Sequence, residues 1–125
     1  MDKKTIKMCT DLPQSKKLAE FLPLESADMY WWYSGKRYYI EAIDDGDFNE
    51  EGDIRAWSLA ALLNVIPKHI KGFNVLRIDI GNDDFSIWYE EIGFGVSNEL
   101  PDITIASAVD ACVEMIVNLH EQELL

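Results

Sequence analysis

Apolar and polar residues alternate in two consecutive stretches of the chain, 73–80 and 85–91. A period of two places successive side chains on opposite faces of a strand, so each stretch predicts a half-buried β-strand. Turn-forming residues at 81–84 predict that the two strands form an antiparallel pair. The stretch 92–96 keeps the alternation but contains two glycines, so it either prolongs the second strand through a bulge or begins a third strand.

Two further runs, 29–33 and 38–43, are rich in aromatic residues and flank a turn that contains Gly35. Aromatic and β-branched residues favour strands, and glycine favours a tight turn. The pair therefore predicts a β-hairpin.

Three segments have apolar residues at helical spacing. The segment Ala108–His120 follows Ser107, which is suited to cap a helix, and it carries an apolar stripe. The segment Trp57–Ile66 is apolar on most faces and stops before Pro67, which predicts a largely buried helix. A short helix is also predicted upstream of Pro23, beginning at a capping sequence that contains a proline.

The segment 44–53 contains six carboxylates and only one large apolar residue, Phe48. It predicts an exposed, flexible acidic loop. The expected fold is a single α+β domain spanning 1–125, with the order α-β-β-α-β-β-(β)-α. A largely antiparallel sheet is expected to pack against two or three helices.

The formal charge of -12 is unevenly distributed along the chain. All 11 Lys and Arg lie at or before Arg77, so the last 48 residues carry acidic side chains and no basic ones. An acidic surface repels phosphates, so direct binding of nucleic acid or of an anionic membrane is not expected.

The sequence predicts a cytoplasmic protein. The residues 1–7 lack the apolar segment of a secretory signal, and the longest apolar stretch, 56–67, is too short to span a bilayer. The two cysteines, Cys9 and Cys112, lie far apart and form no metal-ligand spacing.

No catalytic residue, cofactor or metal site is predicted from a motif. The loop from Asp47 to Asp53 matches the first half of a calcium-binding EF-hand loop, but Ser58 stands where the bidentate glutamate is required. No phosphate-binding loop or serine-nucleophile motif occurs in the sequence.

The aromatic run in 30–39 has three interpretations. The rings can pack partly in the core and partly on the surface, form a contact patch for another protein, or form a stacking platform for sugars or bases. Single-stranded nucleic-acid binders combine such rings with a continuous basic groove, whereas only Lys36 and Arg37 accompany this run.

Two segments, Ile54–Pro67 and Asp110–His120, resemble recurring segments in small proteins of gut anaerobes that are often associated with prophage or other mobile elements. The match covers about a fifth of the chain. In those proteins the first segment ends in a proline and the second follows a capping Ser or Thr, as Pro67 and Ser107 do here. The resemblance implies a bacterial intracellular setting, and it brings no activity, ligand or catalytic residue.

We expect a non-enzymatic protein-interaction module, because the sequence combines uneven acidity with an aromatic hairpin and lacks reactive motifs. The expected anchors are Trp31, Trp32, Tyr33 and Trp88. One alternative is an acidic DNA mimic that inhibits a nucleic-acid-binding protein, with one acidic face formed by Asp79, Asp83, Asp84, Glu90, Glu91, Glu99 and Asp102. Another alternative is a small enzyme, which requires a pocket where titratable groups converge.

Overall fold

A computed structural model describes residues 7–43 and 52–125 of the chain. Its helices are α1 (Leu12–Ala19), the 3₁₀ turn η1 (Leu24–Ser26), α2 (Leu59–Val65) and α3 (Ala108–Glu121). Its strands are β1 (Met29–Tyr33), β2 (Tyr38–Ala42), β3 (Ile54–Ala56), β4 (His69–Ile70), β5 (Asn74–Ile80), β6 (Phe85–Glu91), β7 (Gly95–Val96) and β8 (Ile103–Ile105). The predicted α+β class is confirmed, and most of the predicted acidic loop, 44–51, lies outside the described residues.

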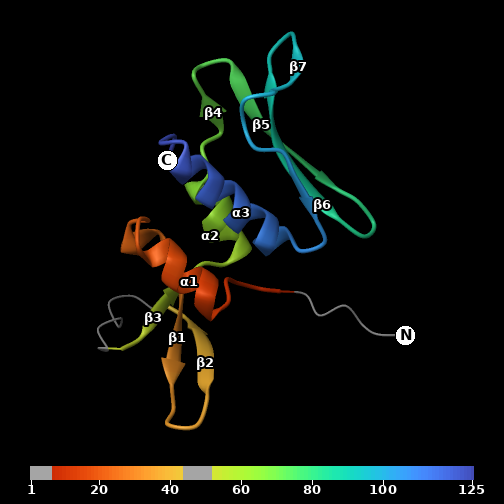
Figure 1. Cartoon of the computed structure of the whole chain (residues 1–125). Coiled ribbons are helices and arrows are strands. Elements are labelled where there is room, and N and C mark those ends of the chain that lie inside the picture. Colours follow the sequence, from red (N-terminus) through yellow and green to blue (C-terminus); the bar gives the residue numbers. More distant parts are fainter. Residues whose placement is uncertain (1–6, 44–51) are drawn as a thin grey trace.

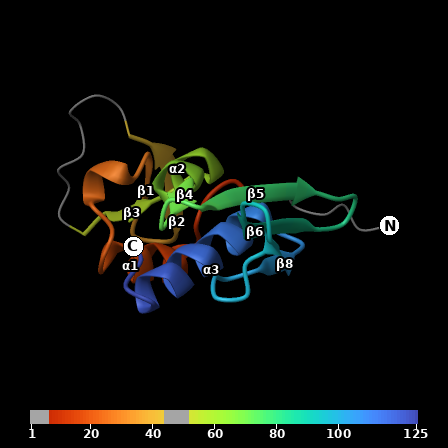
Figure 2. The same cartoon turned by 90° about the horizontal axis from the view of Figure 1, so that it is seen from above.

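The described strands form two antiparallel sheets instead of the one that was predicted. The smaller sheet has the order β2-β1-β3, and the larger has the order β4-β5-β6-β7 with β8 also paired to β6. Figure 1 shows the helices between the two sheets, with the β1–β2 hairpin at one end and β5–β6 at the other. Figure 2 shows that β5 and β6 extend past the end of α3.

One hydrophobic core joins the elements, because it contains residues from α1, α2, α3 and β6. Helix α3 packs against α2, β6 and β8, and seven of its 14 residues are buried, including Cys112, Ile116 and Leu119. Trp57, just before α2, is completely buried, and its indole N–H donates to Ser26 Oγ at 2.9 Å. The core thus links the two sheets through the helices.

The helix starts follow the capping chemistry expected from the sequence. Asp11 accepts a hydrogen bond from the Gln14 backbone N–H at 2.8 Å, and the Gln14 side chain accepts from the Asp11 N–H at 3.1 Å. This capping box satisfies two N–H groups that the first turn of α1 leaves without helical partners. Ser107 caps α3 as predicted, by accepting from the Asp110 N–H at 3.2 Å.

The strand pair predicted from the period of two is confirmed, because β5 pairs with β6 along its full length. Of the two alternatives for the stretch 92–96, the structure has the third strand. Strand β6 ends at Glu91, and β7 pairs with the last two residues of β6. Strands β3, β4 and β8 were not predicted.

The helix predicted to begin at Trp57 begins two residues later, because Ser58 is its N-cap. The Asp28 carboxylate accepts from both the backbone N–H and the hydroxyl of Ser58, and the Trp57 N–H donates to Thr10 Oγ1 at 3.1 Å. These long-range bonds hold Trp57 outside the helix. Helix α2 is also less buried than predicted, with Ala60 and Asn64 exposed.

Candidate functional site

The aromatic hairpin, defined as residues 30–39 of β1, β2 and their turn, contains six rings, and none of them belongs to the buried core. It projects from the helices at the lower end of Figure 1. Trp31 anchors it, because its indole N–H donates to the Thr10 carbonyl at 3.0 Å. Tyr30, Trp31 and Trp32 are half-buried, while Tyr33, Tyr38 and Tyr39 are exposed, so the rings pack partly against the domain and partly on its surface.

At the tip of this hairpin, Tyr33 and Tyr38 form a cross-strand pair on the face that Trp31 shares. Their ring centroids are 5.0 Å apart and the rings are tilted by 55°. Tyr33 is 55% exposed and Tyr38 is 37% exposed. The two rings are already ordered and exposed, so a partner could bury them without the entropy cost of ordering these side chains.

The opposite face of the hairpin carries a stack of Trp32, Tyr39 and Arg37. The Trp32 and Tyr39 ring centroids are 5.0 Å apart, and the Arg37 guanidinium lies 4.8 Å above the Tyr39 ring while its Nε–H donates to the Tyr39 hydroxyl at 2.7 Å. The Trp32 indole N–H is buried and has no acceptor among the described residues.

Trp88, the fourth expected anchor, does not join the other three. It lies in the middle of β6, in the larger sheet, opposite Arg77 and on the face that points away from α3. The structure therefore brings Trp31, Trp32 and Tyr33 together on one strand and leaves Trp88 on a separate surface.

The seven acidic residues expected to form one face do not share one. Glu90 and Glu91 are consecutive in β6 and so point to opposite sides of the sheet, with Glu90 bonded to Arg77 at 3.1 Å. Glu91 and Glu99 line a pocket beside the sheet. The others occupy the far part of β5, its turn, and the approach to β8: Asp79, Asp83, Asp84 and Asp102.

That pocket, called here the polar pocket, has a cavity volume of about 390 Å³ and lies where β4, β5, β6 and β7 meet. Its two turns are tied together, since the Ile92 N–H donates to the Phe73 carbonyl at 2.9 Å. Lys71 adopts a φ of 56°, a conformation that is uncommon outside glycine and is often found at functional sites. The residues that line the polar pocket are Lys71, Phe73, Asn74, Glu91, Phe94, Val96, Ser97, Asn98 and Glu99.

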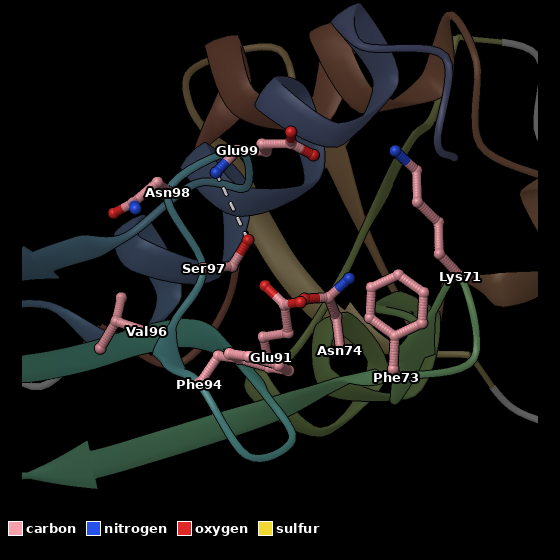
Figure 3. A pocket seen from close by; sticks show the side chains of 9 residues that line it. All are labelled: Lys71, Phe73, Asn74, Glu91, Phe94, Val96, Ser97, Asn98 and Glu99. Atoms are coloured by element: carbon pink, nitrogen blue, oxygen red, sulfur yellow. Dashed lines mark hydrogen bonds between the residues drawn. The ribbon is translucent and has the colours of Figure 1, made fainter.

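Asn74 is the polar residue at the base of this pocket, and it is only 4% exposed. Its Nδ2 donates to the Ile70 carbonyl at 3.2 Å. Because a carbonyl oxygen can only accept, this bond leaves Oδ1 as the free end of the amide, and Oδ1 is buried with no partner among the described residues. Figure 3 shows Asn74 beside Glu91, its partner in the β5–β6 register, with Phe73 next to it.

This pocket was not predicted from the sequence, although Glu91 and Glu99 were each predicted as part of an acidic face. One signal was present, because Asn74 falls in phase with the apolar positions Leu76 and Ile78 of β5. A polar residue on an apolar face indicates either a satisfied core group or a binding site, and only the structure distinguishes the two.

The described helices and sheets contain no group of three or more side chains of His, Cys, Asp or Glu that could hold a metal ion. No helix in the described ranges is long and apolar enough to cross a membrane. Comparison with known proteins finds no matching family model, no matching curated protein and no matching solved structure. Function is therefore inferred from the geometry of the hairpin and the pocket.

Proposed function

We propose that the protein is a non-enzymatic protein-interaction module and that the aromatic hairpin is its contact surface. The observation that carries the proposal is the position of the six rings, which stand outside the core on a hairpin that projects from the domain. Large exposed aromatic groups cost solubility unless something covers them, and Trp, Tyr and Arg dominate the energetically important positions of protein interfaces.

The chemistry of the hairpin favours a partner surface that is apolar with acidic groups at its edge. Lys36 and Arg37 place two positive charges at the tip of a protein whose formal charge is -12. The buried indole N–H of Trp32 also needs an acceptor. A flat sugar or base is a poorer fit, since Tyr33 and Tyr38 are tilted by 55° and form no common plane.

The enzyme alternative draws support from the polar pocket, which contains Lys71, Glu91 and Glu99. Nucleophilic catalysis also needs a hydroxyl or thiol within reach of a base. The one hydroxyl that lines the pocket, Ser97 Oγ, accepts a backbone N–H from Glu99 at 3.4 Å and contacts no acid or base side chain among the described residues. We therefore assign the pocket to binding.

We further propose that the protein works in the cytoplasm, as part of a bacterial or mobile-element system. The cellular compartment is supported by Cys9 and Cys112, which are both free thiols and both buried. Free thiols of this kind are typical of a reducing compartment. The bacterial association rests on the sequence resemblance alone.

The test is differential capture from a lysate of the native host, with three immobilised forms of the protein. These are the wild type, the double variant Tyr33→Ser/Tyr38→Ser, and the control Ile80→Ser, which removes an apolar side chain that is 78% exposed at the end of β5. A partner should bind the wild type and the control, and its recovery from the double variant should fall by about 10-fold or more.

Circular dichroism and thermal unfolding first establish that all three forms are folded. If the same proteins are recovered in the same amounts with all three, the hairpin is not a contact surface and the proposal fails.

A further inference from the structure

We propose that the polar pocket binds an organic cation with N–H donors, a guanidinium or ammonium group, at Asn74, Glu91 and Glu99. This site is separate from the aromatic hairpin, because it lies on the larger sheet. Its ligand chemistry follows from three features of the lining: an unpaired acceptor, two carboxylates and two aromatic rings.

The unpaired acceptor is Asn74 Oδ1. A buried carbonyl oxygen without a hydrogen bond is costly, and nearly all such groups in folded proteins have a partner. Its cross-strand neighbour on the same face is Glu91, whose carboxylate can only accept. A donor from outside the described residues can satisfy Asn74 Oδ1, and the donor that also suits the neighbouring carboxylate is a cationic N–H.

The charge of the pocket also favours a cation. Glu91 and Glu99 line it with two carboxylates, and neither has an ion-pair partner in the described part of the chain. Lys71 is the only basic residue in the lining. In Figure 3, Glu99 and Lys71 extend from opposite sides into the space above Asn74 and Glu91.

The aromatic rings distinguish an organic cation from a metal ion. Phe73 is 49% exposed and Phe94 is 82% exposed, and both line the pocket. An aromatic face attracts an organic cation and also covers its apolar part. Calcium instead takes six to eight oxygen ligands, and no metal-ligating group of three is found among the described residues.

A guanidinium group fits these acceptors best, because it presents five N–H donors in one plane and stacks on aromatic rings. Such a group can come from a small free molecule or from an arginine side chain of another protein. Both sources place the same cation between Asn74 and the two carboxylates.

The experiment uses isothermal titration calorimetry on the full chain at low salt. The first pair of probes is n-butylguanidine and its neutral counterpart n-butylurea, and the second is acetyl-Gly-Arg-Gly-amide and the same peptide with citrulline. We expect the two cations to bind and the two neutral probes not to bind. In an NMR titration, the side-chain amide signals of Asn74 should shift with the cations alone.

Isosteric variants test the site without disturbing the fold. Glu91→Gln and Glu99→Gln should each weaken binding by about 10-fold, the loss expected for a charge-assisted hydrogen bond. Glu121→Gln removes the same charge from an exposed position on α3 and should leave binding unchanged. Lys71→Gln should strengthen the binding of butylguanidine, because it removes a like charge from the lining.

If the arginine peptide binds more tightly than butylguanidine, the natural source of the cation is a protein side chain. If butylguanidine binds equally or more tightly, the source is a free molecule. Three results would overturn the proposal: no binding of either cation, binding that all three Glu→Gln variants retain equally, or a site that takes calcium in place of the cations.

Discussion

The ammonium group of Lys7 lies 2.7 Å from a carboxylate oxygen of Asp110, which joins the first described residue of the chain to the first turn of its last helix. Lys7 also binds Asp11 at 2.9 Å, and the Gln14 side chain donates to the same oxygen of Asp110 at 2.8 Å. The starts of α1 and α3 are therefore held by one small polar network, and this network gives a pH-dependent prediction.

Asp110→Asn should lower the free energy of unfolding by about 1 kcal/mol at neutral pH, because it removes a partly exposed ion pair and a negative charge at a helix N-terminus. Burial raises the pKa of the Asp110 carboxyl, but the hydrogen bonds from Lys7 and Gln14 and the charge of Lys7 outweigh burial and lower it below 3.8. A lowered pKa in the folded state means that the stabilisation is present above the unfolded value and is lost as the pH falls through the folded value.

The difference between wild type and Asp110→Asn should therefore vanish in acid, well below pH 3.8. Urea denaturation across this range measures it, with Glu114→Gln as the control, since Glu114 is an exposed acid of the same helix. If the wild type and Asp110→Asn differ by the same free energy of unfolding in acid and at neutral pH, the stabilisation does not come from the ionised Asp110 carboxylate.

How far the sequence predicted the fold depends on whether the signal was local. The strands β5 and β6 were predicted because their alternation is continuous over seven residues each, and α3 because its cap and apolar stripe are both local. Strands β3 and β8 have three residues each and depend on pairing with β1 and β6, so no local period marks them. Short strands of this kind follow from tertiary contacts.

The candidate sites divide in the same way. The aromatic hairpin is one continuous segment, so its residues could be predicted together, whereas its separation from Trp88 depends on the arrangement of two sheets. The polar pocket joins residues on two turns, and Asn74 meets Glu91 only through the β5–β6 register. Neither the composition of the chain nor the spacing of its residues predicts that Asn74 and Glu91 lie side by side.

Tyr89→Phe should destabilise the fold by about 1–2 kcal/mol at neutral pH, because it leaves a carbonyl without its partner. The Tyr89 hydroxyl donates to the Pro67 carbonyl at 2.7 Å, and the side chain is 1% exposed. Burial also raises the pKa of this phenol far above its usual 10.0. The unfolded phenol therefore ionises in alkali while the folded one stays neutral, and the stabilisation is lost as the pH rises above 10.0.

In urea denaturation, the difference in free energy of unfolding between the wild type and Tyr89→Phe should thus shrink above pH 10.0. Tyr33→Phe, at a site that is 55% exposed, serves as the control for the loss of a phenol hydroxyl. If this difference in free energy of unfolding stays the same at higher pH, the Tyr89 phenol ionises equally in the folded and the unfolded state.

Neither cysteine should react with a disulfide reagent while the protein is folded. Cys112 is completely buried, and burial raises the pKa of its thiol to about 12, while the charge of Lys68 lowers it slightly. Burial and then the Asp28 carboxylate also raise the pKa of Cys9, which is 7% exposed. At pH 8 the Cys112 thiolate then amounts to about one part in 10⁴, and only the thiolate attacks the reagent.

Titration with 5,5′-dithiobis(2-nitrobenzoic acid) measures this directly. Both thiols should react after denaturation, and a Cys9→Ser variant isolates the signal of Cys112. Rapid labelling of the folded Cys9→Ser variant would mean that α3 opens readily and that Cys112 is available for redox chemistry.

Gly35→Ala should loosen the aromatic hairpin without removing any of its rings. Gly35 has a φ of 96°, and the Ser34 N–H donates to the Arg37 carbonyl at 3.0 Å across this two-residue turn. A left-handed backbone costs an alanine about 1–2 kcal/mol, and asparagine tolerates it better. Apart from Gly35 and its two chain neighbours, no described heavy atom lies within 4 Å of the added methyl position, so the cost is conformational and not steric.

The expected order of amide protection in β1 and β2 is therefore wild type, then Gly35→Asn, then Gly35→Ala, measured by hydrogen exchange. Protection in β5 and β6 is the internal reference and should not change, because those strands belong to the other sheet. If the hairpin presents Tyr33 and Tyr38 to a partner, binding should weaken in the same order, since the ring pair must then be ordered on association. Unchanged protection in Gly35→Ala would mean that the strands hold their register without help from the turn.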